Sequence, residues 1–266
     1  MLGLVMILSL MLVFGVVASG MAYTIDGNLS DWGVNPLVGA PGSEDWIPNP
    51  GVDRYVVEDI YHGWDVGPGG GGQDFDIEAV YFDSDSSNYY IAIVTGFAKT
   101  GEFGYWAPQN RYYMGDIFLD FGGTLYAVET GAKIDIAGAS AGDIFQVTSY
   151  STPDPYASEK PAQVTGGTKV GSATLVYDRA YDGYNAQGYT NYTGSEDSSN
   201  YKDQNTSYGT GGAADDGTGS WDENRICDWD EHWVIEVAIP KIYLPSGLFS
   251  VHITEDCGND SGDLPV

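Results

Sequence analysis

The chain has 266 residues and a formal net charge of −28, from 38 Asp and Glu against 10 Lys and Arg. Such acidity repels phosphate, so the composition argues against nucleic-acid binding and against anionic membrane surfaces. The three histidines are too few and too scattered for a typical zinc signature, and there is no Cys-x-x-Cys-His motif for covalent haem.

The first segment, Met1 to Ala22, is predicted to be a secretory signal peptide. It is an apolar run followed by small residues, and Gly20 and Ala22 suit a cleavage site before Tyr23. An uncleaved membrane anchor is the alternative, because the run is just long enough to span a bilayer. The mature protein is therefore expected to be secreted, extracellular or on the cell surface, with no membrane span after cleavage.

Residues 23–266 are expected to form a single domain. The opening, Tyr23 to Trp32, predicts a short strand, an Asp-Gly turn and a Trp that covers the edge of a core. Residues 33–73 are rich in Pro and Gly and are expected to be irregular loops.

Short runs of β-forming residues between turn signals then predict strands along the rest of the chain. The clearest is a hairpin, 76–82 and 89–95, joined by the turn 83–88. Further strands are expected at 115–121, 125–129, 143–150, 173–177, 232–239 and 248–254. No segment after residue 22 has a helical apolar period, so the pattern predicts an all-β fold, a sandwich or a barrel.

Residues 181–220 form a tract of Tyr, Gly, Asn, Asp and Ser, which is either a long ordered loop or a disordered insertion. Two of the four N-x-S/T sequons fall in this tract, which favours a surface position for it. An archaeal glycoprotein would be modified at such sites. The four candidate glycosylation sites are Asn28, Asn191, Asn205 and Asn259.

The two cysteines, Cys227 and Cys257, are expected to form a disulfide in an oxidising compartment. Closing that loop would stabilise the fold by roughly 3–4 kcal/mol on the chain-entropy model.

Several segments together resemble a known family. TIDGNLSDW, at 24–32, resembles the start of family 9 carbohydrate-binding modules and the related DOMON-like domains. Four later segments resemble, in the same order, a group of secreted prokaryotic surface proteins: DIEAVYFDSDSSNYYIAIVTG at 76–96, GDIFLDFG at 115–122, HWVIEVAIP at 232–240 and HITEDCGND at 252–260. The resemblance implies a jelly-roll-like antiparallel β-sandwich with long irregular loops and structural calcium.

Calcium is the expected cofactor, because short carboxylates in turns are hard oxygen ligands. Asp76 and Glu78 share one strand face, and Asp116 and Asp120 share another, so four carboxylates would meet if the two strands were neighbours. The candidate ligands are Asp26, Asp31, Asp76, Glu78, Asp116, Asp120, Asn259 and Asp260, and a site drawing on Glu78, Asp116 and Asp260 is the sharpest form of the prediction.

Each of these acidic groups also has a simpler interpretation. Asp26 and Asp31 can cap backbone amides in a turn. The segment 83–88 has alternating oxygen ligands but lacks the Gly and the distant Glu of an EF-hand, so a solvated hairpin turn is favoured there. The overall acidity would also suit a halophilic protein.

No motif for a serine, cysteine, zinc or phosphate-binding enzyme is present, so the protein is expected not to be an enzyme. Trp46, Trp64 and Trp106 lie in expected loops and are candidates for stacking on a sugar. The main functional hypothesis is a calcium-stabilised, self-assembling subunit of a surface layer, sheath or filament. The alternative is a carbohydrate-binding module for extracellular glycans, and a haem-binding DOMON-like role is a third hypothesis.

Overall fold

The computed structural model describes residues 22–36, 46–57, 77–103, 111–152, 161–180, 232–256 and 261–266. Several sequence predictions lie outside these residues. They are the signal peptide up to Met21, the tract 181–220, Cys227 and Cys257, Asp76, Asn259, Asp260, Trp64, Trp106, and the sequons at Asn191 and Asn205.

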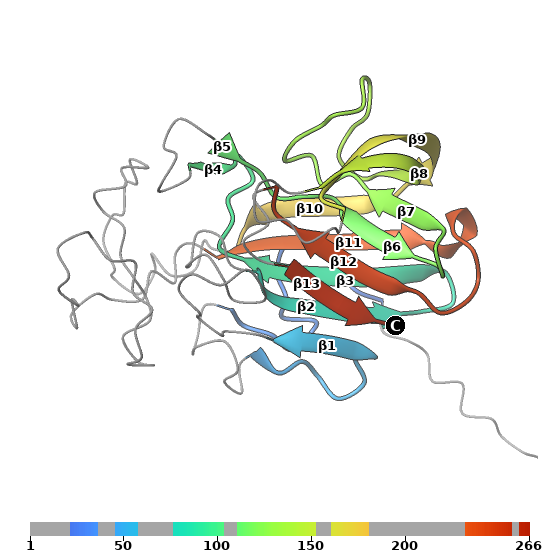
Figure 1. Cartoon of the computed structure of the whole chain (residues 1–266). Coiled ribbons are helices and arrows are strands. Elements are labelled where there is room, and N and C mark those ends of the chain that lie inside the picture. Colours follow the sequence, from blue (N-terminus) through green and yellow to red (C-terminus); the bar gives the residue numbers. More distant parts are fainter. Residues whose placement is uncertain are drawn as a thin grey trace, which may run out of the picture.

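Two antiparallel sheets face each other (Figure 1). The five-stranded sheet has the order β1 (Arg54–Val57), β2 (Ile77–Ser84), β3 (Asn88–Thr95), β11 (Trp233–Pro240) and β10 (Thr174–Arg179). The six-stranded sheet has the order β13 (Ser261–Pro265), β12 (Ser250–Thr254), β6 (Ile117–Asp120), β7 (Leu125–Val128), β8 (Asp143–Ser151) and β9 (Gln163–Ser172). A small ladder joins β4 (Glu102–Phe103) to β5 (Arg111–Tyr112), and a 3₁₀ helix, Lys241–Tyr243, follows β11. The predicted all-β sandwich is confirmed.

The main core lies between the two sheets because alternate residues of each strand point inward. Val80, Ile91 and Ile235 from one sheet belong to the same buried cluster as Leu119 and Val251 from the other. Fully burying each such side chain is worth about 1.5–3 kcal/mol.

The outer face of the five-stranded sheet is also buried, so its strands are apolar on both sides, as in the run Ile-Ala-Ile-Val of β3. Residues 23–34, here called the opening segment, cover this face together with Trp46. Trp32 and Trp46 have no exposed surface. The outer face of the six-stranded sheet carries a smaller cluster of Phe118, Ala127, Phe145 and Val164.

The structure departs from the sequence prediction in several places. The opening segment covers the sheet without forming the expected strand, and β1 lies within a stretch that was expected to be only loops. The sequence analysis missed β9 and β13, because Gln163–Ser172 is rich in Gly and Ser261–Pro265 is short and polar.

Candidate functional site

Seven carboxylates are buried among the described residues, and they are the candidates for a functional site. They are Glu78, Asp83, Asp116, Glu129, Asp143, Glu236 and Glu255. A buried carboxylate must be paired, hydrogen-bonded or protonated, since an isolated charge in an apolar interior is very costly. A carboxylate whose hydrogen-bond or charge partners all come from the fold is structural. One that lacks such partners could hold a ligand.

Glu236, on the outer face of β11, joins the opening segment to the five-stranded sheet. Its Oε2 accepts hydrogen bonds from the backbone N–H groups of Asp26 and Gly27, each at 3.0 Å, and its Oε1 accepts one from Trp32 Nε1 at 2.9 Å. Burial raises the pKa of Glu236, and the three donors oppose that rise by favouring the charged form. All the partners of this carboxylate come from the fold itself, so its role is structural.

Asp26 and Asp31, both predicted calcium ligands, act as turn acceptors here. Asp26 Oδ1 accepts the N–H of Asn28 at 2.9 Å, and Asp31 Oδ2 accepts the N–H of Thr24 at 2.8 Å. Asn28, the one sequon residue that the structure describes, is exposed. Among the described residues, no three Asp, Glu, His or Cys side chains converge as metal ligands would.

Glu78 makes a buried ion pair on the same outer face. Its Oε2 lies 2.7 Å from His232 Nδ1, and both side chains are almost completely buried. The Trp46 ring packs edge-on against the His232 ring, with 5.5 Å between centroids, and Tyr81 Oη donates to the Trp46 carbonyl at 2.9 Å. The prediction that Trp46 is free to stack on a sugar is therefore wrong, because its ring covers this ion pair.

The most unusual pair of acids is Asp116 and Glu129, on the outer face of the six-stranded sheet. Ile117 pairs with Val128 in the antiparallel ladder of β6 and β7, so the next residues outward, Asp116 and Glu129, stand opposite each other. Neither side chain has any exposed surface. Like charges directly across a ladder are destabilising, and burial makes this worse.

Hydrogen bonds favour the ionised form of Asp116 and leave the proton to Glu129. Asp116 Oδ1 accepts the N–H of Thr130 at 3.0 Å, and Oδ2 accepts the N–H of Val164 at 2.8 Å. Glu129 accepts only a longer bond from the N–H of Gly131, at 3.4 Å. Burial, followed by the neighbouring Asp116 charge, raises the pKa of Glu129, so without a cation Glu129 holds a proton that it shares with Asp116.

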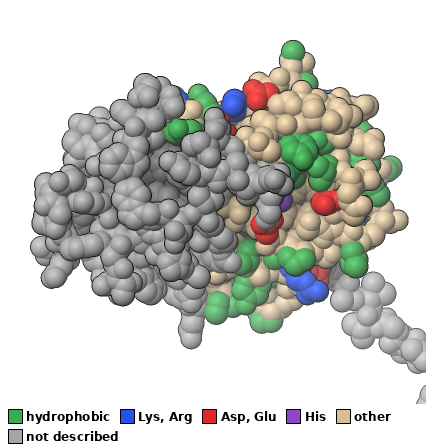
Figure 2. Space-filling view, in the orientation of Figure 1, with side chains coloured by type: hydrophobic (Ala, Val, Ile, Leu, Met, Phe, Trp, Pro, Cys, Tyr) green, Lys and Arg blue, Asp and Glu red, His purple; other side chains and the backbone are tan. Residues whose placement is uncertain are grey.

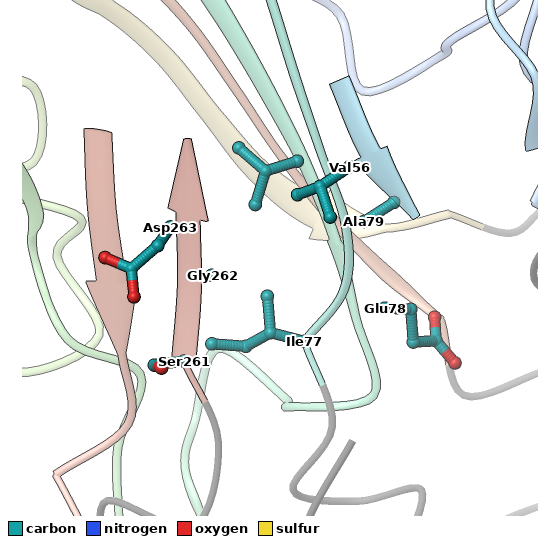
Figure 3. Close-up of a pocket in the computed structure, with 8 residues that line it drawn as sticks. Val56, Ile77, Glu78, Ala79, Ser261, Gly262 and Asp263 are labelled. Atoms are coloured by element: carbon teal, nitrogen blue, oxygen red, sulfur yellow. The ribbon is translucent and has the colours of Figure 1, made fainter. Parts of the chain in front are cut away.

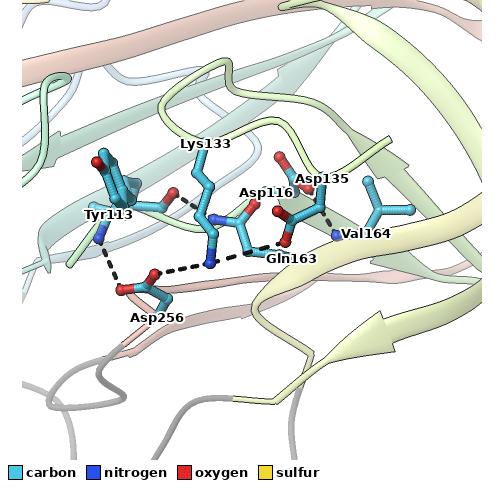
Figure 4. A network of polar contacts seen from close by, with 8 residues as sticks. Tyr113, Asp116, Lys133, Asp135, Gln163, Val164 and Asp256 are labelled. Carbon is cyan, nitrogen blue, oxygen red and sulfur yellow. Dashed lines mark hydrogen bonds and ion pairs between the residues drawn. The ribbon is translucent and has the colours of Figure 1, made fainter. Parts of the chain in front are cut away.

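Two more acids lie nearby, and together with Asp116 and Glu129 we call them the acidic end: Asp135 and Asp256 (Figure 4). Lys133 Nζ lies 3.3 Å from Asp256 and 3.8 Å from Asp135. Asp256 Oδ1 accepts the N–H of Tyr113 at 2.8 Å, while burial raises the pKa of Asp256.

Gln163 adds a neutral oxygen to this end. Its Nε2 donates to the Met114 carbonyl at 2.9 Å, while its buried Oε1 has no hydrogen-bond partner among the described residues. Figure 4 shows Gln163 beside Asp116. Carboxylate and amide oxygens are the ligand types that calcium prefers.

The predicted calcium ligands that the structure describes do not come together at one site. Glu78 lies on β2 in one sheet and Asp116 precedes β6 in the other, on opposite outer faces of the sandwich. The two strands are therefore not neighbours, and the condition for their carboxylates to meet is not fulfilled. Asp120 is half-buried and accepts the N–H of Gly123 in a turn, at 2.5 Å. The segment 83–88 forms the hairpin connection, as favoured, with the turn itself at 85–87, in which Asp85 accepts the N–H groups of Ser87 and Asn88.

Glu129 is the functional candidate that the sequence analysis missed. It was assigned to the expected strand 125–129, next to 115–121. Counting outward from the turn between those strands would have placed Glu129 opposite Asp116.

A small hollow lies where β13 packs against β1 and β2 (Figure 3). Its volume is about 50 Å³, far below the several hundred Å³ of typical ligand sites. Figure 3 shows Glu78 pointing away from Asp263, whose Oδ1 lies 2.9 Å from His252 Nδ1. The hollow is therefore not a sugar site, and its two carboxylates do not form a catalytic pair.

The surface has two features suited to contact with other molecules. The hairpin of β8 and β9, here called the β8–β9 ribbon, has no Asp or Glu after Asp143 within either strand. Figure 2 shows a mostly uncharged surface in this region. Near the ribbon, the connection from β11 to β12 exposes 86% of Ile242 and 87% of Leu248.

Comparisons with protein-family models, with curated proteins and with solved structures find no match to this chain. In the part of the chain that the structure describes, no helix has the length and apolar character needed to cross a membrane.

Replacing Glu236 by Gln should loosen the opening segment. The amide can accept through one oxygen only and turns an N–H₂ group toward an N–H donor, so we expect a loss of about 1.5–3 kcal/mol of stability. Urea denaturation followed by tryptophan fluorescence measures the change. Asp178→Asn, an exposed change on the adjacent strand β10, is the matched control, and equal stability of the two variants would contradict this role of Glu236.

Glu129→Gln should change the pH dependence of stability. In the absence of divalent cations, the native wild-type chain keeps a proton on Glu129. The unfolded chain loses this proton once the pH rises above the ordinary carboxyl pKa of about 4.3. This proton therefore makes wild-type stability fall as pH rises, and Gln removes that contribution. We expect the variant to gain stability relative to wild type between pH 5 and pH 8, measured by melting in chelator. Parallel profiles for wild type, Glu129→Gln and the control Asp120→Asn would refute the assignment.

Proposed function

We propose that this protein is a non-enzymatic extracellular structural protein whose copies assemble into a layer, sheath or filament stabilised by calcium. The observation that carries the proposal is the contrast between a chain of net charge −28 and an exposed β8–β9 ribbon without carboxylates beyond Asp143. Although the chain as a whole is acidic, copies of it can approach each other at a surface that lacks carboxylates.

Direct contact between acidic surfaces of two copies is unfavourable. Two carboxylates about 4 Å apart repel by roughly 4 kcal/mol at an effective dielectric constant near 20. Screening at physiological ionic strength acts over about 8 Å, so it leaves repulsion between charges in direct contact largely intact. Copies of this chain therefore need an uncharged contact, a bridging cation, or both.

Calcium is assigned to the acidic end. Asp116 and Glu129 supply two carboxylates and Gln163 an amide oxygen, three donors of the type that calcium takes. A divalent cation would replace the proton on Glu129 and remove the repulsion across the ladder of β6 and β7. Lys133, the lysine that contacts the acidic end, offsets only part of its negative charge.

The buried acids also support a non-enzymatic role. A glycosidase needs two carboxyl groups about 5–9 Å apart that flank a sugar-sized cleft. In the described residues, Glu78 is paired with His232, and Asp116 and Glu129 are fully buried.

The alternative, a carbohydrate-binding module for extracellular glycans, depends on the sequence resemblance and now on Trp64 and Trp106, since Trp46 is buried. A glycan array with wild type and Trp106→Ala tests it. A specific sugar signal that the variant loses would favour glycan binding.

Assembly should depend on calcium. We expect the secreted chain to form polymers in millimolar calcium and to disperse in chelator, as seen by negative-stain electron microscopy and light scattering. Magnesium at equal ionic strength is the control, because it fits an all-protein oxygen site less readily than calcium does. Monomers under both conditions would overturn the proposed function.

Calcium binding to the acidic end should also release protons. We expect calcium to raise the melting temperature more at pH 8 than at pH 5, because it must displace the Glu129 proton at the lower pH. Calcium should stabilise Glu129→Gln less than it stabilises wild type. Equal stabilisation of both chains would place any bound calcium elsewhere.

A further inference from the structure

We infer that two copies of this chain join by antiparallel pairing of their β9 edges, in a register centred on Gly167. The inference rests on the proposed function, for which it names the contact and the symmetry. It starts from the position of β9, the last strand of the six-stranded sheet, which pairs with β8 alone among the described strands.

A long unpaired edge strand is a template for another strand, because its outward N–H and C=O groups lack partners in the sheet. β9 has ten residues, and of those from Thr165 to Lys169 all are exposed except the partly buried Gly166. Proteins commonly protect such edges with charges, prolines or bulges. Gly166–Lys169 contains no proline, and each of its four residues pairs with β8, while the extra residues of β9, Thr165 and Val170, lie at the two ends of this run and Thr148 is an extra residue on β8.

The occupant is identified by charge. Lys169 is the sole charged residue of β9, and its Nζ lies 2.6 Å from Asp143 Oδ1, so the charge is compensated within the same hairpin. A basic partner would be attracted to the acidic surfaces and would gain nothing from this neutral edge. A second copy, with its own charge of −28, is the partner that requires a neutral edge.

The exposed stretch sets the register. At one end, Gln163 and Val164 are buried. At the other end, Gly171 packs beneath the ring of Tyr243, so close that an added Cβ would lie 2.4 Å from the ring. The stretch available to a partner is therefore 165–169, and its centre is Gly167.

A two-fold axis at Gly167 places Thr165 of each copy opposite Lys169 of the other. This arrangement keeps the two lysines apart, whereas a register centred on Lys169 would place them directly opposite each other. The contact is the same surface on both copies, as a two-fold interface requires.

Cysteine cross-linking tests the register. In an antiparallel ladder, opposed Cα atoms are about 4.5–5.5 Å apart, a separation that a disulfide spans. Chains carrying Thr165→Cys and chains carrying Lys169→Cys, distinguished by mass labels, are mixed under assembly conditions and mildly oxidised. We expect disulfide-linked dimers that contain one chain of each kind, and neither variant alone should give comparable linkage.

Two controls make the result specific. Wild type reports any linkage through Cys227 and Cys257. Thr174→Cys, exposed at the start of β10 in the other sheet, replaces Lys169→Cys in a parallel mixture and should not link to Thr165→Cys.

Hydrogen exchange of the unmodified chain gives an independent readout, with slower exchange of the amides of residues 165–169 expected on assembly. Polymers that form in calcium without mixed dimers and without this protection would overturn the β9 contact while leaving the proposed function standing. Linkage within Thr165→Cys alone would also overturn it, since that result means a parallel register or an antiparallel register centred on Thr165. If no polymers and no mixed dimers form, both proposals fail.

Discussion

The five-stranded sheet depends on one buried carboxylate. Its strands are apolar on both faces, so its outer face must be covered, and the opening segment provides the cover through Trp32 and its neighbours. Glu236 holds that segment in place with three hydrogen bonds from two backbone amides and the indole of Trp32. Gly27 can approach because it adopts a φ of 81°, where a side chain would be strained and its Cβ would lie 3.3 Å from Val176. An apolar residue at position 236 would leave the buried indole N–H of Trp32 and the two part-buried backbone N–H groups without this acceptor.

The same principle applies to three other buried acids, Glu78, Asp83 and Asp143. Glu78 is paired with His232, and Asp143 with Lys169. Asp83 accepts a hydrogen bond from Tyr23, and burial together with this carboxylate raises the pKa of the Tyr23 hydroxyl. Each of these acids has a donor supplied by the fold. The pair of Asp116 and Glu129 differs, because the two backbone donors of Asp116 satisfy one negative charge and leave the second to a proton or a cation.

The sequence predicted what depends on local pattern and missed what depends on strand order. Alternation and turn residues revealed the hairpin of β2 and β3, and the opening motif was recognised as a cover with Trp32 on a core edge. The contact of Glu78 with His232 could not be read from spacing, because it requires β11 to insert beside β3 from far along the chain. β9 could not be predicted for another reason, its glycines, which have low strand propensity. Gly167 lies so close to β8 that a Cβ would be 2.5 Å from the Gln146 carbonyl, so packing selects a residue with low strand propensity.

The acidic end and the β9 edge are physically connected. Asp116 Oδ2 accepts the N–H of Val164, and the exposed stretch of β9 begins at the next residue, Thr165. The N–H of Asp116 in turn donates to the carbonyl of Ala162, so Asp116 anchors both sides of Gln163. In the proposed assembly, a calcium ion bound by Asp116 and Glu129 would hold the Asp116 side chain in position and, through its bond to Val164, fix the start of the edge strand. Calcium would then promote assembly in two ways, by lowering the charge of each copy and by ordering the strand that pairs. The second effect does not require calcium to lie between subunits.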